Sequence, residues 1–459
     1  MSKLTRFLPS SRVILFATCF LSLANFFNLN YRRPESSELH TAREFVPLEV
    51  RPNVVEESPP ATQKPIRLYQ IQPDDIYIYS AFVDRRFNHH NVRMLGIQHE
   101  DASKRLLCHF NINRNLISEV AVKENYLIFG DWPSPKLRYM ARMYACPLPD
   151  GLQPAQIEVS VDGSNVSGLV LPIVSVGGVE GGRQDLAVCV KGIWGSLDAN
   201  KLIEWLEFNR LLGVQKVVFY DVMLTGEAVK VVEHYAQSGF VTIERFDFAQ
   251  KMTRLFDEDP LNSHLRGSNL SQEQAYLVSM NDCYYTQRNH FKYVMILDVD
   301  EVIVPMRSTE SLHDVIEAAN VEFPNAASFN FHTAWHLGDY GMTSASDDEP
   351  LFMQRNLRRS EVTRSQPKAI INTDRAITVN WHGTVTVPSH RSLIGNVFLP
   401  WQRYGYVHHF RRKCKHAPDK CKEMLRTHST DDVIPRYKSR LSNAVNNVLT
   451  ELELRYSHI

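Results

Sequence analysis

Three acidic residues within four positions form the strongest candidate for chemistry in this sequence. Asp298, Asp300 and Glu301 directly follow the apolar run 293–297. In an extended segment Asp298 and Asp300 point to the same side, where two carboxylates repel each other unless a cation or a shared proton compensates. Mg²⁺ and Mn²⁺ prefer oxygen ligands and can bridge to the diphosphate of a nucleotide sugar. The triplet therefore predicts a divalent metal site, with Asp298 and Asp300 as ligands that also hold the diphosphate.

The same segment matches the signature of haloacid dehalogenase phosphatases, in which an apolar strand precedes DxDx(T/V)(L/V). Asp298 would then be the nucleophile and Asp300 the acid/base. That motif usually opens its catalytic domain, whereas two strand–helix units precede Asp298 here. The phosphatase fold also needs a later acidic pair after another apolar strand, and the acids at 347–349 lack such a strand. The phosphatase is our second hypothesis, and a catalytically inactive glycan-binding protein is the third.

Basic and imidazole side chains near the C-terminus are further candidates. The run 406–414 contains His408, His409 and Arg411. A neutral imidazole could complete a metal site, and Arg411 and Lys368 could neutralise a departing diphosphate. If the reaction inverts the sugar's anomeric centre, a carboxylate must accept the proton of the attacking hydroxyl, and Asp339 is our candidate for this catalytic base.

Alternating strands and helices are expected to position these residues. Asp198 can cap a helix that ends at Gly213, the strand 216–220 follows and ends on Asp221, and a helix over 228–238 leads into another strand. The segment 271–274 resembles a capping box, which predicts a helix towards Asn289 before the apolar strand 293–297. Ligands of open α/β sheets bind at the carboxyl ends of strands, which is where Asp298 stands. We predict an α/β domain over 183–430 and a C-terminal extension over 431–459.

A β-rich domain is expected before this α/β domain, over 67–179. Short β-rich runs at 76–79, 92–97 and 156–161 are separated by polar turns. No residues in it have the spacing of metal ligands or of a nucleophile. Scaffolding and acceptor binding therefore both stay open as its role.

An uncharged, mostly apolar segment at 13–31 predicts contact with a membrane. Lys3, Arg6 and Arg12 precede it without any acid, so we expect a cytosolic tail over 1–12 and a single-pass type II orientation with the body in the secretory lumen, most simply the Golgi. Cleavage of a signal peptide near 22–24 is the alternative to an uncleaved anchor. The proline-rich, charged segment 32–66 reads as an extended stem.

Composition supports a lumenal, folded protein. Lys plus Arg and Asp plus Glu both number 51, so no overall positive charge attracts nucleic acid, and we expect no nucleic-acid partner. Six cysteines follow the apolar segment and can form disulfides, with Cys108–Cys146 and Cys414–Cys421 as the near-neighbour pairings. Asn165 and Asn269 lie in glycosylation sequons.

The chain from 183 to about 427 resembles glycosyltransferase family 92, a group of metal-dependent, galactosyltransferase-like enzymes with a GT-A fold. Order and spacing together carry the resemblance, which extends into the β-rich region. The matching stretches are 80–85, 202–214, 218–221, 281–283, 298–301, 367–370 and 407–411.

The resemblance implies a transferase with a UDP-sugar donor, a glycan acceptor on a glycoprotein or glycolipid, and Mn²⁺ or another divalent cation. Galactose as the transferred sugar rests on this resemblance alone. It also implies that Asp298 and Asp300 bind metal and diphosphate, that His409 is the third metal ligand, and that Tyr220 and Asp221 face the nucleotide. Neither the acceptor glycan nor the oligomeric state follows from the sequence.

Overall fold

The computed structural model describes residues 68–455 except for eleven short gaps, at 73, 88, 103, 113–114, 129–138, 166, 175–180, 247–269, 308–310, 345–348 and 390–391. Contacts divide the chain into Met1–Ser58 and Pro59–Ile459, and all described residues belong to the second unit. The expected membrane segment 13–31, the stem 32–66 and the sequon residue Asn269 lie outside the described residues. Within the described ranges, no helix combines the length and apolar character needed to cross a membrane.

Two antiparallel sheets form the β-rich region, and the three strands expected there are confirmed within β2, β3 and β8. The first sheet has the order β1-β2-β3-β7-β6 and consists of Tyr69–Ile71, Ile76–Asp84, Asn91–His99, Tyr139–Pro147 and Glu124–Leu127. The second has the order β5-β4-β8-β9 and consists of Asn115–Ala121, Leu106–Ile112, Gln156–Val161 and Leu169–Pro172. The Cys108–Cys146 disulfide joins β4 of one sheet to β7 of the other.

A mixed nine-stranded sheet forms the centre of the α/β region. Its order is β12-β11-β10-β13-β17-β15-β21-β14, and β20 pairs with β15. The strands in that order are Val241–Arg245, Lys216–Thr225, Gln184–Ser196, Phe291–Ile296, Thr363–Asn372, Ala326–Leu337, Tyr406–Arg411 and Glu301–Val304, with β20 at Ile394–Phe398. The strands β12, β11, β10 and β13 are parallel, so their carboxyl ends lie along one edge.

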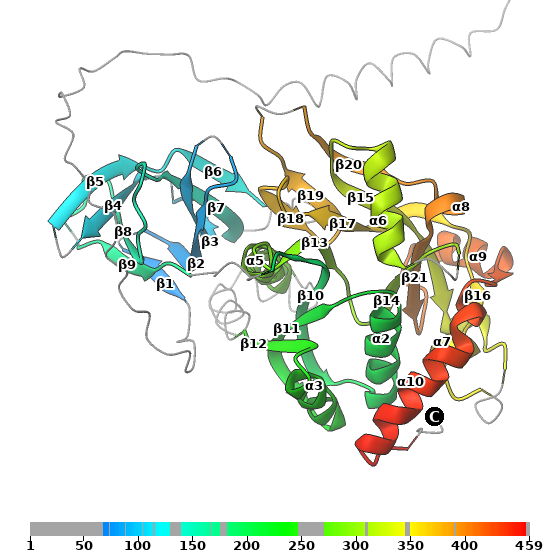
Figure 1. The fold of residues 1–459 in the computed structure, drawn as a ribbon. Helices are drawn as coiled ribbons and strands as arrows, with labels where there is room; N and C mark the ends of the chain where they lie inside the picture. Colours follow the sequence, from blue (N-terminus) through cyan, green and yellow to red (C-terminus); the bar gives the residue numbers. More distant parts are fainter. Residues whose placement is uncertain are drawn as a thin grey trace, which may run out of the picture. The chain divides into compact units, whose positions relative to one another are not determined.

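Helices cover both faces of this sheet (Figure 1). α2 (Ala199–Leu211), α3 (Glu227–Gln237) and α10 (Lys438–Glu451) bury their apolar residues in one core with the sheet. The expected start and end of α2 are confirmed, because the Asp198 side chain accepts a hydrogen bond from Lys201 N and Gly213 has a left-handed φ of 98°. Residues of the expected C-terminal extension thus supply α10 to the core that contains α2.

α5 (Leu270–Gln287) lies on the opposite face and joins the two regions (Figure 1). Because Leu270 is already helical, Ser271 lies inside α5 and the capping box expected at 271–274 does not open the helix. One core cluster contains residues of β2, β3, β7, α5 and β13. The β-rich region and the α/β region are therefore packed together rather than linked by the chain alone.

Shorter elements complete the α/β region. They are α6 (Leu312–Glu322), η2 (Gly338–Tyr340), α7 (Phe352–Arg355), β16 (Arg358–Arg359), β18 (Thr378–Asn380), β19 (Gly383–Thr386), α8 (Trp401–Tyr404), α9 (Pro418–Arg426), β22 (Ser429–Thr430) and η3 (Ile434–Tyr437). β18 and β19 form a hairpin that packs against α5, β15 and β17.

Candidate active site

The acidic triplet lies where the sheet's order changes. Asp298 and Asp300 occupy the connection between β13 and β14, at the carboxyl end of β13. β10 runs parallel to β13 with Cys189 opposite Ile296, which places Lys191 beside Asp298. The expected position of the acids at the end of a buried strand is confirmed.

Asp298 is held between two lysines. Its Oδ2 lies 3.0 Å from Lys191 Nζ and 3.6 Å from Lys368 Nζ. Burial alone would raise the pKa of Asp298, but the two ammonium groups hold it well below its usual range. Asp298 is therefore a carboxylate at physiological pH.

Glu301 is the buried member of the triplet. It is 1% exposed, its Oε2 lies 2.7 Å from Lys368 Nζ, and the same oxygen accepts a hydrogen bond from Asp298 N at 3.0 Å. Burial opposes the charge of Lys368, yet Glu301 and Asp298 raise the pKa of this lysine above its ordinary value. Lys368 therefore compensates buried carboxylates in this structure, whereas the sequence suggested a role for it at the diphosphate.

His409 faces the triplet from the neighbouring strand. β21 pairs with β14 so that His409 stands opposite Glu301. Its Nδ1 lies 3.0 Å from Glu301 Oε1, in a geometry outside the angular range of a hydrogen bond, and its Nε2 lies 3.5 Å from Asp300 Oδ2. Arg411 Nε donates to Nε2 at 3.0 Å, so the imidazole proton is on Nδ1 and faces Glu301.

The side chains of Asp300, Glu301 and His409 supply ligand atoms that suit a divalent cation. One ligand atom from each of Asp300, Glu301 and His409 lies within 4.8 Å of the other two. A metal-binding histidine commonly has a carboxylate beside its other ring nitrogen, and Glu301 occupies that position next to Nδ1 of His409. Asp300 and His409 Nε2 are accordingly the groups suited to bind the ion directly once Arg411 leaves Nε2, while Glu301 lies beside Nδ1 of His409. Asp298 could join them if its lysines moved.

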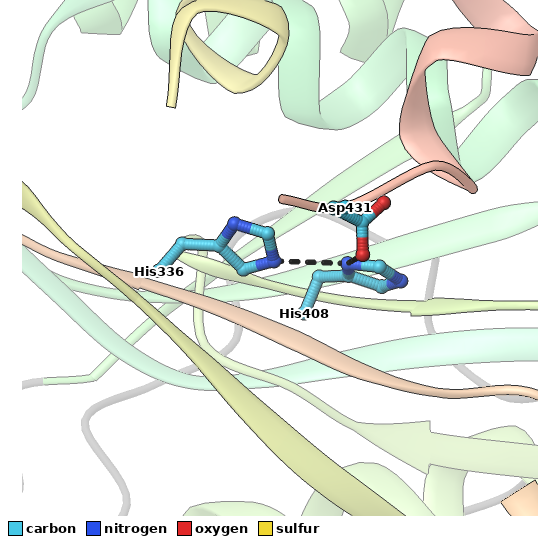
Figure 2. A group of neighbouring side chains, drawn as sticks. All are labelled: His336, His408 and Asp431. Carbon is cyan, nitrogen blue, oxygen red and sulfur yellow. Dashed lines mark hydrogen bonds and ion pairs between the residues drawn. The ribbon is translucent and has the colours of Figure 1, made fainter. Parts of the chain in front are cut away.

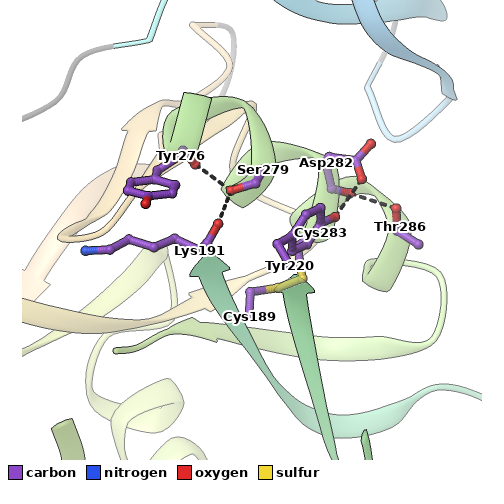
Figure 3. The surroundings of a disulfide bond; sticks show 8 residues. All are labelled: Cys189, Lys191, Tyr220, Tyr276, Ser279, Asp282, Cys283 and Thr286. Atoms are coloured by element: carbon purple, nitrogen blue, oxygen red, sulfur yellow. Dashed lines mark hydrogen bonds between the residues drawn. A yellow bond between two sulfur atoms is a disulfide. The ribbon is translucent and has the colours of Figure 1, made fainter. Parts of the chain in front are cut away.

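Lys191 was missed by the sequence analysis. Its ammonium lies 5.9 Å from the ring centre of Tyr276 and 5.8 Å from that of Trp381, and its side chain is 25% exposed. Figure 3 shows how the backbone is fixed: Cys189 is bonded to Cys283 on α5, and Ser279 Oγ donates to Lys191 O at 2.5 Å. A single lysine within the apolar run 186–194 was a signal that could have marked it.

Tyr220 and Asp221, predicted to face the nucleotide, differ in accessibility. Tyr220 is 1% exposed, and its hydroxyl donates to Asp282 Oδ2 at 2.6 Å (Figure 3). Asp221 is half-buried at the end of the parallel stretch of β11 and accepts a hydrogen bond from Leu224 N at 2.7 Å. Asp221 remains accessible to a ligand, whereas the Tyr220 side chain supports α5.

Asp339 and Arg411 lie at the adjoining ends of β15 and β21, where Leu337 pairs with Arg411. Asp339 is exposed in η2, and its Oδ2 accepts a hydrogen bond from Cys414 N at 2.8 Å. Arg411 stacks over Trp335 at 4.6 Å, which in turn stacks on His409 at 4.3 Å. Asp339 is thus on the same edge as the acidic triplet but does not contact it in the structure.

The second histidine of the pair, His408, belongs to a separate buried cluster with His336 and Asp431 (Figure 2). His336 Nδ1 donates to Asn356 O at 2.7 Å, so His336 Nε2 accepts from His408 Nδ1 at 3.1 Å. Burial lowers the pKa of His336 to about 3 and that of His408 to about 4, so both are neutral at physiological pH.

Asp431 already has cationic and hydroxyl partners. Its Oδ2 accepts from Tyr406 Oη at 2.5 Å and from Arg359 Nε at 3.1 Å. The side chains of His408 and Asp431 are fully buried and hydrogen-bonded within the core, so this cluster is a core network. The group of Asp300, Glu301 and His409 is the better candidate for a metal site, because the Asp300 side chain is 43% exposed.

Comparison with known proteins decides the family. Residues 184–449 match the profile of Glycosyltransferase family 92, which covers more than half of the chain and includes the acidic triplet and His409. The chain belongs to glycosyltransferase family 92. This assignment decides in favour of a glycosyltransferase over the phosphatase hypothesis.

Individual relatives are distant. The chain is similar to the beta-1,4-galactosyltransferase galt-1 of Caenorhabditis elegans, with 26% identity over 134 residues that cover 28% of each chain. Among solved structures, S. aureus TarS 1-349 matches with 14% identity and a TM-score of 0.24, covering 49% of this chain and 60% of that one.

Three disulfides and one of the two sequon asparagines lie within the described residues. Cys108–Cys146 and Cys414–Cys421, the near-neighbour pairings, are present, together with Cys189–Cys283. Asn165 is exposed, as a glycan acceptor must be.

Proposed function

We propose that this protein transfers galactose from UDP-galactose to a glycan on a glycoprotein or glycolipid, with Mn²⁺ or another divalent cation bound by Asp298, Asp300 and His409. The observation that carries the proposal is the opposed pair of Asp300 and His409 Nε2 at the end of β13 in a family 92 domain. Galactose is supported by the similarity to the beta-1,4-galactosyltransferase galt-1 of C. elegans.

Charge balance supports joint binding of the cation and the donor. Three carboxylates, Asp298, Asp300 and Glu301, are matched by Lys191, Lys368 and Arg411. A divalent cation alone would disturb this balance, whereas a cation accompanied by a diphosphate would nearly preserve it. The bound cation would neutralise charge on the diphosphate as it departs.

In the proposed reaction, the acceptor hydroxyl oxygen forms a bond to C1 of the sugar. The bond from C1 to the diphosphate oxygen breaks, and its electron pair stays on UDP. A carboxylate takes the hydroxyl proton, and exposed Asp339 is our candidate for this base in an inverting reaction. Asp221 would hold the nucleotide, and Arg411 would meet the phosphates once it leaves His409.

We propose that the Lys191 ammonium leaves Asp298 and pairs with the diphosphate when the UDP-sugar binds. Lys191→Met should therefore raise the affinity for Mn²⁺ alone, because Asp298 loses its competing ammonium, and should weaken UDP binding by about 10-fold. Calorimetric titrations of Mn²⁺, and of UDP in excess Mn²⁺, would measure the two effects. Lys292→Met, on an exposed lysine paired with Asp185, is the control. Parallel losses of both affinities would contradict this exchange.

The activity test uses the soluble lumenal body with Mn²⁺ and a panel of UDP-sugars. We expect transfer from UDP-galactose to glycans on mixed glycoproteins, measured by incorporation of labelled sugar. Binding of glycans without UDP binding would favour the inactive glycan-binding hypothesis. Release of phosphate from phosphomonoesters, with a phosphorylated Asp298, would favour a phosphatase.

We further propose a type II protein of the Golgi membrane with its catalytic domain in the lumen. The uncharged segment 13–31, the basic residues before it and the three disulfides support this placement. Protease treatment of sealed vesicles should spare the body of the protein. Its digestion without detergent would contradict the orientation.

A further inference from the structure

We propose that a polar pocket beside the hairpin β18–β19 binds a neutral sugar unit of the acceptor; this deepens, and rests on, the proposed transferase function. The cavity has a volume of about 300 Å³, at the lower end of the range for small-molecule sites. Its lining includes Asn330, Asn380, His382, Thr384 and Phe398.

An unpartnered hydroxyl group points to a ligand here. Thr384 is 6% exposed, and its Oγ1 has no hydrogen-bond partner among the described residues. A buried hydroxyl without a partner costs about 1–3 kcal/mol. The oxygen is shielded from solvent in this conformation, so a ligand in the cavity would remove that cost once the side chain turns towards it.

The amide side chains around the pocket are already fixed in place. Asn330 Nδ2 donates to His382 O at 2.6 Å, and Asn396 Nδ2 donates to Thr384 O at 2.8 Å. Asn396 Oδ1 also accepts from Thr384 N at 3.1 Å. These bonds hold β19 against β15 and β20, so a ligand would meet a preorganised set of polar groups and lose little affinity to ordering them.

The chemistry of the lining selects a neutral, hydroxyl-rich ligand. No Asp, Glu, Lys or Arg lines the cavity in the described part of the chain. The lining itself therefore favours hydroxyl groups, which can bond to Thr384 and the amides, and a neighbouring guanidinium, that of Arg364, lies over the ring of Phe398 at 4.9 Å. Phe398 adds an aromatic side chain to the lining, and its ring also contacts Arg364 and His332.

Two lining residues are next in sequence to residues that contact the acidic triplet or Lys191. His382 lines it, and the preceding Trp381 lies 5.8 Å from Lys191 Nζ, which contacts Asp298. Pro367 also lines it, and the following Lys368 contacts Asp298 and Glu301. A sugar in the pocket is thus separated from the acidic triplet by Trp381 on one side and the β17 backbone on the other.

The test compares two threonines of the same hairpin. Thr384→Val removes the unpartnered hydroxyl and should leave the melting temperature unchanged or higher, while raising the acceptor KM about 3- to 10-fold. Thr378→Val removes a hydroxyl that donates to Thr386 Oγ1 at 2.7 Å and does not line the pocket. That control should melt at a lower temperature with an unchanged acceptor KM. UDP affinity in Mn²⁺ should be unchanged in both variants.

A binding measurement separates this inference from the proposed function. Saturation-transfer NMR with the methyl β-glycosides of glucose, galactose and N-acetylglucosamine should show binding to the wild-type protein, weakened in Thr384→Val and Phe398→Ala, and no binding of methyl β-glucuronide. Failure of the wild-type protein to bind UDP would overturn the transferase function alone, because glycoside binding could still be observed. Normal transfer with unchanged glycoside binding and acceptor KM in both pocket variants would overturn the pocket assignment alone.

Discussion

Asp298→Asn is expected to lower sugar transfer by about 100-fold or more, and Asp300→Asn should do the same. Each substitution keeps the shape of the side chain but removes one negative charge from the proposed metal and diphosphate site. The Asp298→Asn substitution also removes the ionic attraction between position 298 and the two lysines, Lys191 and Lys368. His409→Ala should mainly raise the Mn²⁺ concentration required for activity, by about 10- to 100-fold.

Folding must be measured alongside activity, since the two acids differ in their surroundings. The Asp298 side chain is 27% exposed and ion-paired, whereas that of Asp300 is 43% exposed. We therefore expect a small loss of thermal stability in Asp298→Asn and almost none in Asp300→Asn. Asp374→Asn, on a surface acid paired with Arg183, is the control for activity. An active Asp298→Asn variant with normal metal dependence would contradict the site.

Asp84→Asn is expected to lower the free energy of unfolding by about 3–5 kcal/mol, because it leaves buried guanidinium groups without their carboxylate. The Asp84 side chain is fully buried and contacts Arg93 Nε at 2.8 Å, Arg288 Nη1 at 2.7 Å and Arg86 Nη2 at 2.8 Å. Burial would raise the pKa of Asp84, but Arg86, Arg288 and Arg93 hold it well below its usual range. Arg288 directly follows the α5 end, so this cluster joins the β-rich region to the α/β region.

The surface variant Asp374→Asn tests whether burial causes the large loss of unfolding free energy expected for Asp84→Asn. Asp374→Asn also breaks an aspartate–arginine pair, with atoms 2.6 Å apart, but the Asp374 side chain is 52% exposed and should contribute under about 1 kcal/mol. Urea unfolding of both variants gives the two values. Similar small losses would show that Asp84 does not hold the two regions together.

Local patterns in the sequence were enough to predict the strand–helix units and the position of Asp298. Asp198 and Gly213 mark the ends of α2, and the apolar run 293–297 marks β13 because a central strand is buried on both faces. The family resemblance added His409, which lies more than a hundred residues further along the chain.

Contacts set by tertiary pairing could not be predicted in this way. Lys191 reaches Asp298 only because β10 lies beside β13, and Glu301 lies beside His409 only through the register of β14 and β21. Lys368 and Tyr220 looked available to a ligand, yet the fold buries both. Side-chain spacing along the sequence carries no information on which neighbouring strand supplies the countercharge.

Calorimetric binding of UDP to the wild-type protein, with Mn²⁺ and with a chelator, tests the central claim most directly. The account predicts binding in Mn²⁺ that is lost in chelator and weakened by about 10- to 100-fold in Asp300→Asn. Equal UDP affinity with Mn²⁺ and with chelator, or unchanged affinity in Asp300→Asn, would contradict a metal-dependent donor site at the end of β13.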